Sequence, residues 1–310
     1  MRASVSDDTT GDAAAQTLRA VFCMLVGVAL LSLNDALIKS LTSNYPVGQL
    51  LFTRGLFVFP WIFLLAFRQG GLHRLRVKSI KGQALRGVCV ICSAFLFVNG
   101  LFYLPLADAV AVSFAGPLFI TALAPFALGE HVGWRRWLAV LAGFAGILLM
   151  VRPGAEVMQW AVLFPLGATL FGGVRDLITR RISQTENTIA VLFVTTSFVM
   201  LAGLTTAPFG WVTLQAQDLW TFAASGLLIT GAHYLMIEAF RQGEAALVAP
   251  FKYTSMIWAM LFGFLIFGDL PDGWTLSGAG LVILAGLYIL RRETRLRRRP
   301  VTAVGPSARL

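Results

Sequence analysis

The chain has 310 residues, of which 57% are hydrophobic and only 13% are charged. A water-soluble protein of this length could not bury so much apolar surface, because soluble proteins carry about 25% charged residues. A lipid bilayer solvates apolar side chains on every face of a helix, so the composition predicts an all-α integral membrane protein. The net charge of +10 does not indicate a nucleic-acid partner, since the basic residues lie between apolar segments and at the C-terminus.

Ten apolar segments are long enough to cross a bilayer, which takes about 20 residues per helix. Residues 1–19 precede them and are polar and acidic, so we expect a disordered cytoplasmic segment; a signal peptide would begin with basic residues. A basic tail, 294–310, follows the last segment. The expected spans are 20–41, 47–67, 84–104, 107–128, 134–151, 159–180, 188–207, 218–240, 245–267 and 274–290.

The lysine and arginine residues fall mainly on one side of these spans. If the N-terminus is cytoplasmic, 20 of the 25 lie in cytoplasmic segments and one, Arg152, lies in an outer loop. Six of the 20 are in the loop 68–86. Four of the 20 (Arg86, Arg135, Arg136 and Arg180) fall at the cytoplasmic ends of spans, and the remaining four of the 25 lie deeper within spans. Positive charge marks the cytoplasmic side, which predicts cytoplasmic termini and a place in the cytoplasmic (inner) membrane. The basic tail is expected to attract anionic lipid.

The two halves of the chain resemble each other. Residues 35–39 (DALIK) align with residues 176–180 (DLITR) at an offset of 141, and residues 107–110 (ADAV) align with residues 243–246 (GEAA). Each half contains five expected spans, and because five is odd the second half must enter the membrane in the opposite orientation. The sequence therefore predicts ten transmembrane helices as two inverted five-helix repeats. Such repeats are typical of secondary transporters, whose substrate site lies at the repeat interface.

Several short motifs together resemble the drug/metabolite transporter superfamily, in the form that has two EamA domains. The motifs are Leu104-Pro-Leu-Ala-Asp-Ala-Val-Ala-Val112, Gly116-Pro117, Leu128-Gly-Glu130, Gly133-Trp-Arg-Arg-Trp137, Ala249-Pro-Phe-Lys-Tyr253 and Phe267-Gly-Asp-Leu-Pro271. The second copy has Gly-Asp where the first has Gly-Glu, which is a departure from exact repetition. The resemblance implies a first EamA-like repeat, 20–154, and a second, 155–293. It also implies an inner-membrane carrier of small organic solutes such as amino acids, riboflavin, S-adenosylmethionine or metallophores.

Charged side chains within spans are costly and are usually retained for a function or a structural pair. Asp35 and Lys39 are four residues apart on one helix face, so we expect them to pair. An alternating-access carrier needs a breakable closure on each side of its site. The charges predict an outer gate of Asp35, Lys39 and Arg54, and an inner gate of Asp176, Glu238 and Lys252. Static pairs, or lysines that extend to the lipid headgroups, are the alternative.

The candidate substrate pathway has five further residues: Asn99, Arg175, His233, Tyr234 and Tyr253. His233 could carry protons near neutral pH or could be a hydrogen-bonded structural residue, and both readings stay open. Glycines in 142–146 and 278–286 are small enough to let the fifth and tenth helices pack closely.

Other classes of protein fit the sequence less well. An ATP-driven pump would need a phosphate-binding loop with a Gly-Lys pair, which this chain does not contain. A membrane enzyme would need clustered histidines and acids, whereas His73, His131 and His233 are far apart, so no enzyme, metal or cofactor is expected. A non-transporting scaffold or sensor, and a homodimer, stay open. The sequence thus predicts an alternating-access secondary transporter whose partner is a small-molecule substrate, either amino-acid-like or otherwise amphiphilic.

Overall fold

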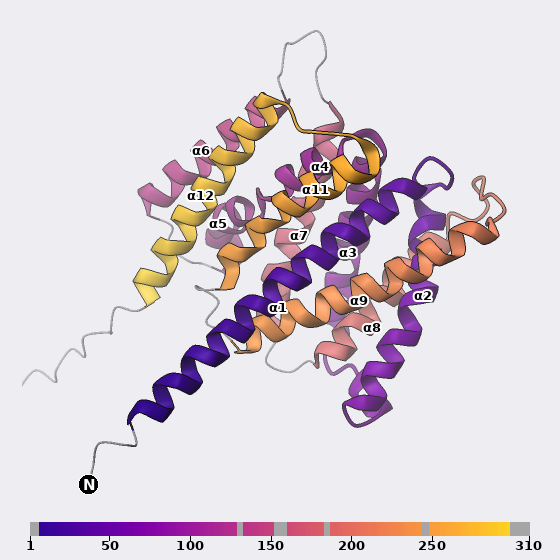
Figure 1. Ribbon diagram of the computed structural model, residues 1–310, viewed down its shortest axis with the longest axis horizontal. Coiled ribbons are helices and arrows are strands. Elements are labelled where there is room, and N and C mark those ends of the chain that lie inside the picture. Colours follow the sequence, from indigo (N-terminus) through magenta and orange to yellow (C-terminus); the bar gives the residue numbers. More distant parts are fainter. Residues whose placement is uncertain (1–5, 129–132, 152–159, 183–186, 243–247, 298–310) are drawn as a thin grey trace, which may run out of the picture.

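The structure is a computed structural model that describes residues 6–128, 133–151, 160–182, 187–242 and 248–297. All the regular elements in these ranges are helices (Figure 1). A helix satisfies its backbone hydrogen bonds within its own segment, which is what a bilayer without water demands. The prediction of an all-α protein is therefore confirmed for the described residues.

The helices follow one another with short connections. The first half contains α1 Ser6–Leu41, α2 Val47–Arg68, the 3-10 helix η1 Leu72–Leu75, α3 Ile80–Tyr103, α4 Leu106–Ser113, α5 Gly116–Leu128 and α6 Trp134–Val151. The second half contains η2 Trp160–Val162, α7 Leu163–Ile182, α8 Thr188–Leu204, η3 Ala216–Asp218, α9 Leu219–Gln242, η4 Ala249–Thr254, α11 Ser255–Phe267 and α12 Gly273–Arg297.

Eight stretches of these helices are long and apolar enough to cross a membrane. Two shorter apolar stretches, Trp160–Arg175 and Thr188–Leu204, coincide with the sixth and seventh expected spans. The chain is therefore a multi-pass membrane protein. The count of ten spans and the inverted repeat stay predictions.

Helix boundaries differ from the expectation at three places. α1 begins at Ser6, within the segment expected to be disordered. α3 begins at Ile80, so Arg86 lies inside a helix and not in the loop. α12 continues to Arg297, past the start of the expected tail, while residues 298–310 lie outside the described part of the chain.

The fourth expected span is divided into two helices, α4 and α5. Pro117 has no amide hydrogen, so an unbroken α-helix cannot pass through it with all of its hydrogen bonds. The amides of Phe114 and Ala115 instead bond to carbonyls three residues earlier, at 3.2 and 3.0 Å. The ninth expected span has a similar irregularity, because the 3-10 helix η4, with Pro250 near its start, precedes α11.

Five antiparallel helix pairs join the two halves: α1–α9, α2–α8, α3–α7, α4–α11 and α6–α12. The direction follows from residue contacts, for example in α3–α7. There Ser93 bonds to Ala168, whereas Gly100, later on α3, lies against Pro165, earlier on α7. Figure 1 shows α6 and α12 side by side at one edge, and α1 and α9 near the middle.

The α6–α12 pair is in backbone contact at Gly146 and Gly278. A Cβ atom on Gly146 would lie 2.7 Å from the Gly278 carbonyl oxygen, and the reverse distance is 2.5 Å. Only glycine fits at such a crossing. The predicted close packing of these two helices is thus confirmed at this point, although a Cβ on Gly280 would meet nothing within 4 Å.

Candidate functional site

We describe the positions of the polar residues relative to the two ends of the helix bundle. We call the end where the turn after Leu41 joins α1 to α2 the Tyr45 end, and the end where η1 joins α2 to α3 the η1 end. The Tyr45 hydroxyl donates a hydrogen bond of 2.6 Å to the Asp218 carboxylate. Because Asp218 directly precedes α9, this helix begins at the Tyr45 end.

Hydrogen bonds join the two halves of the chain at the Tyr45 end. The Tyr45 hydroxyl, in a side chain only 3% exposed, also accepts a bond of 3.0 Å from the Gln215 amide. The Gln49 side chain donates to the Val212 carbonyl at 2.6 Å and accepts from the Val212 amide at 3.0 Å. Burial, and then the bond to Asp218, raises the pKa of Tyr45, so its hydroxyl remains a donor at neutral pH. We call these five residues the Tyr45 closure.

Below this closure, α1, α2 and α9 meet at a polar cluster. The Asp35 carboxylate attracts the Arg54 guanidinium and accepts a bond of 3.0 Å from the Asn34 amide. The side-chain oxygen Oδ1 of Asn34 in turn accepts a buried hydrogen bond of 2.6 Å from the Ser225 hydroxyl. The structure therefore brings Asp35 and Arg54 together, and it adds Asn34 and Ser225, which the sequence analysis did not select. We call these four residues the Asp35 cluster.

Lys39 forms contacts outside the Asp35 cluster. Its ammonium group donates to the Leu104 carbonyl at 2.5 Å and lies 5.2 Å from the centroid of the Phe267 ring. The carboxylate that attracts it most is Asp269. Lys39 thus ties α1 to the α3–α4 junction and to α11, and it does not serve as the expected partner of Asp35.

Two arginines stand level with each other on the antiparallel pair α3–α7. Ser93 donates to the Ala168 carbonyl at 2.8 Å, which fixes the register of the two helices. Arg86 precedes Ser93 by seven residues on α3, and Arg175 follows Ala168 by seven residues on α7. Each arginine is therefore about two helical turns closer to the η1 end. Arg86 is only 8% exposed and donates a bond of 2.7 Å to the Thr195 hydroxyl on α8.

Three positive charges act on His233 of α9. The cations whose charge acts on it are Arg175, Arg54 and Arg86. Its Nδ1 atom lies 2.8 Å from the Ile229 carbonyl oxygen and donates to it in the tautomer that carries the proton there. Side chains from α2, α3, α7 and α9 therefore share one interior region, and we call Arg54, Arg86, Arg175 and His233 the arginine cluster.

Arg86 is a candidate site residue that the sequence analysis missed. It was counted with the charges of the loop 68–86, although the apolar run that predicts the third span begins at residue 84. That overlap was the available signal, because a cation inside an apolar run is a candidate for function.

The other predicted residues make different contacts. The Asn99 side chain donates to a carbonyl one turn earlier in its own helix at 2.8 Å. Glu238 accepts a bond of 2.7 Å from Gln242, also one turn away. Lys252 is exposed in η4, and Tyr234 is half-buried on α9 beside His233. The backbone of Asp176 belongs to α7, whereas its side chain lies outside the described part of the structure.

Tyr253 connects the two irregular helices. Its ring packs edge-on against Phe114 at the α4–α5 break, with 5.1 Å between the ring centroids. Its hydroxyl lies against Gly286 of α12, so a larger residue at that position would require the tyrosine side chain to shift. The break in the fourth span and the 3-10 turn in the ninth therefore meet in the interior.

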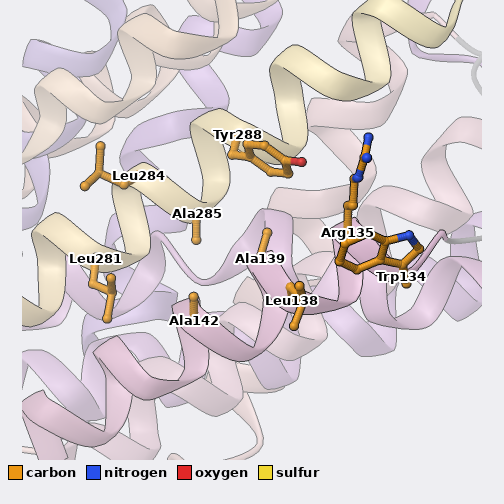
Figure 2. A pocket seen from close by; sticks show the side chains of 9 residues that line it. All are labelled: Trp134, Arg135, Leu138, Ala139, Ala142, Leu281, Leu284, Ala285 and Tyr288. Carbon is orange, nitrogen blue, oxygen red and sulfur yellow. The ribbon is translucent and has the colours of Figure 1, made fainter.

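The cavity shown in Figure 2 lies apart from these polar residues. It is a groove between α6 and α12 with a volume of about 460 Å³. Its lining is mostly apolar, and Trp134 and Leu284 are each 67% exposed, so it opens onto surface that faces lipid. The lining residues are Trp134, Arg135, Leu138, Ala139, Ala142, Leu281, Leu284, Ala285 and Tyr288. We therefore place the candidate pathway at the two polar clusters and not in this groove.

Within the described ranges, no three His, Cys, Asp or Glu side chains come together in a way that could hold a metal ion.

Known proteins resemble this chain over nearly its whole length. The riboflavin transporter of Rhizobium johnstonii is 32% identical over 91% of this chain and 93% of its own. The S-adenosylmethionine uptake transporter of Rickettsia prowazekii is 27% identical over 92% of this chain and 96% of its own. The pseudopaline exporter of Pseudomonas aeruginosa is 24% identical over 84% of this chain and 92% of its own.

Structure and family comparisons agree with these likenesses. One crystal structure of another protein superimposes with a TM-score of 0.61 at 18% identity, and the match covers 92% of this chain and 99% of that one, so the two share a fold. The model of the EamA-like transporter family matches residues 18–152 and again residues 159–291. Since the two matches together cover most of the chain, the protein belongs to the EamA-like transporter family.

Proposed function

We propose that this transporter moves a small organic metabolite across the cytoplasmic membrane by alternating access. Its ten helices form two inverted five-helix repeats, and both of its termini are cytoplasmic. Relatives named for riboflavin, S-adenosylmethionine and pseudopaline support an amphiphilic or amino-acid-like solute.

The observation that carries this proposal is the pairing of helices between the halves. With the ten spans numbered in chain order, the pairs are one–eight, three–six, two–seven, four–nine and five–ten. Exchanging the halves replaces each span by the one five places away in the chain. This exchange turns the one–eight pair into the three–six pair, and it returns each of the other three pairs to itself. A two-fold relation between two repeats requires this pattern, and inverted repeats place the substrate site between them.

The irregular helices follow the same relation. The α4–α5 break lies in the fourth span and η4 lies in the ninth, so each half contributes one interruption. The contact between Phe114 and Tyr253 brings the two interruptions together. Discontinuous helices at the repeat interface commonly form the substrate site of secondary transporters, which supports a site beside this contact.

The Tyr45 closure is suited to be a gate, because each of its hydrogen bonds joins one half to the other. Tyr45 and Gln49 belong to the first half, and their partners belong to the second. Separation of the halves at this end must break these bonds together. We assign Asp35, Lys39 and Arg54, which lie nearby, to the same outer gate.

The inner gate is assigned to Asp176, Glu238 and Lys252 on the η1 side. The described contacts between α1 and α9 on that side are apolar and involve Ala20, Met24 and Ala239. Apolar faces can separate without leaving a polar group unpaired, so this side can open while the Tyr45 closure holds.

Transport is tested with purified protein in proteoliposomes. Riboflavin and S-adenosylmethionine are the first probes, and a metabolite library is screened in parallel for thermal stabilisation. We expect saturable counterflow of at least one stabilising solute and its loss in Arg54→Ala. Folded protein that carries none of the stabilising solutes would refute the proposal.

Orientation is tested separately in intact cells. Single cysteines are placed near each terminus in a variant that lacks Cys23, Cys89 and Cys92. A membrane-impermeant maleimide should label both cysteines only after the cells are permeabilised. Labelling of one terminus from outside would contradict the ten-span topology.

A further inference from the structure

We propose that the arginine cluster binds an anionic group of the transported solute, namely a carboxylate or a phosphate. This inference rests on the proposed function, since it concerns the same interior. It adds the chemical class of the group that the site recognises.

The first support is the register of α3 and α7. The bond between Ser93 and Ala168 sets these antiparallel helices so that Arg86 and Arg175 stand at one level. Guanidinium groups are planar forks of N–H donors that match the oxygens of carboxylates and phosphates. Two guanidinium groups at the same level on facing helices can therefore bind one oxyanion between them.

The second support is the space and polarity beside Arg175. A Cβ atom on Gly172 would lie 3.8 Å from the Ser93 hydroxyl and 3.9 Å from an Arg175 guanidinium nitrogen. Both groups therefore border the same side of α7, at a position where glycine leaves room. A hydroxyl beside a guanidinium adds a neutral donor to the charged donors, a combination well suited to an oxyanion.

The third support is the sign of the charge around His233. Arg54, Arg86 and Arg175 all act on it, although they come from three different helices. Asp35 already attracts Arg54, so we assign the anion to the guanidinium groups of Arg86 and Arg175, because positive charge in a low-dielectric interior attracts an anion that enters beside it. Arg86 is held in place by its bond to Thr195, so the charge is already positioned before a solute arrives.

The experiment uses inorganic phosphate and acetate as probes, because neither requires knowledge of the solute. The melting temperature of the purified full-length protein is followed as each anion replaces chloride at constant ionic strength. We expect a saturable rise, and we expect Arg86→Gln and Arg175→Gln to weaken the half-saturating affinity about tenfold, as for loss of one charged hydrogen bond. Arg74→Gln, in exposed η1, is the matched control and should behave like the unaltered protein.

The two anions distinguish the two sources of negative charge. A response to phosphate alone assigns the site to phosphorylated solutes, and a response that includes acetate assigns it to carboxylates. Arg175→Lys keeps the charge and should retain part of the response, which separates loss of the site from loss of the fold. Absence of any anion-specific rise, or an equal rise in Arg175→Gln and Arg74→Gln, overturns the inference.

The outcome is independent of the transport assay. If proteoliposomes carry a solute but the protein shows no anion response, this inference fails and the proposed function stands. If the anion response is present and no stabilising solute is carried, the proposed function fails while the anion site remains.

Discussion

The edge of the helix bundle and its centre share close glycine packing, and the centre adds polar side-chain contacts: a Cβ atom on Gly226 of α9 would lie 2.6 Å from the Phe57 carbonyl oxygen of α2. At the edge, α6 and α12 touch through the backbones of Gly146 and Gly278. At the centre, α1, α2 and α9 meet through the polar side chains of the Asp35 cluster. Lipid provides no hydrophobic force between helices, so close packing holds the edge. The difference indicates that the breakable polar contacts belong to the centre, so we expect changes at the edge to act on stability and changes at the centre to act on transport as well.

Gly278→Leu should have the largest effect, because it removes the fixed contact. The added side chain would meet the Gly146 carbonyl oxygen, and both are on rigid helices, so α6 and α12 must separate. Overpacking of this kind costs about 3 kcal/mol. The melting temperature and the yield of monodisperse protein should both fall in size-exclusion chromatography.

Gly280→Leu is the matched control, on the same helix two residues away. A Cβ atom there would meet nothing within 4 Å, so the melting temperature should stay close to that of the unaltered protein. Equal losses in the two variants would show that the edge does not depend on the glycine contact.

Asp35→Asn should have the next largest effect, and it acts on the centre. The change removes the negative partner of Arg54 while the guanidinium stays in the bundle. Removal of one partner of a buried ion pair lowers the free energy of unfolding by about 3 kcal/mol, and by less where water reaches the site. Thermal unfolding of Asp35→Asn, Arg54→Gln and the double variant gives the coupling between the two residues. Additive losses would mean that the two residues do not form a pair.

Tyr45→Phe should shift the balance between open and closed states by about 1–2 kcal/mol, through loss of the bond to Asp218. The readout is the rate at which a maleimide labels the cysteine of a Val47→Cys variant, and this rate should rise. Tyr288→Phe, in the edge groove, is the control and should leave the labelling rate unchanged. A Tyr45→Phe rate equal to that control would remove Tyr45 from the gate.

The pH dependence of this closure follows from the raised pKa of Tyr45. A raised pKa means that the protonated hydroxyl, the donor in the bond, is favoured in the closed state. Its contribution is complete below the usual tyrosine value of about 10 and is lost only as the pH rises above it. The labelling rate of the Val47 cysteine should therefore be constant near neutral pH.

The sequence predicted what depends on composition and on spacing within one helix. The spans followed from apolar length, and the contact at Gly146 and Gly278 followed from small residues in the fifth and tenth spans. Pro117 and Pro250 lie within expected spans, where proline can kink a helix, but the division of the fourth span and the 3-10 turn of the ninth do not follow from the sequence. Whether a helix bends or breaks at proline depends on its neighbours, which a single sequence does not specify.

Contacts between distant segments were beyond prediction. The expected Asp35–Lys39 pair relied on spacing of four residues, yet Lys39 is drawn to a carbonyl and a carboxylate from other helices. Tyr45 and Asp218 are 173 residues apart and meet only after the halves pack. Polar groups in a bilayer take the partners that the helix packing offers, and these partners carry no local sequence signal.

The smallest effect is expected for Ala139→Leu, which adds volume to the groove in Figure 2. The groove opens to lipid, so the side chain has room, and the unfolding free energy should change by about 0.5 kcal/mol or less. Uptake of the solute found in the screen should stay within about twofold of normal. The same enlargement at Ala232, which is fully buried on α9 next to His233, should reduce uptake strongly because Gly27 of α1 packs closely against α9 at this residue. If Ala139→Leu impaired uptake as severely as Ala232→Leu, α6 and α12 would have to move during transport, and the division between a fixed edge and a working centre would not hold.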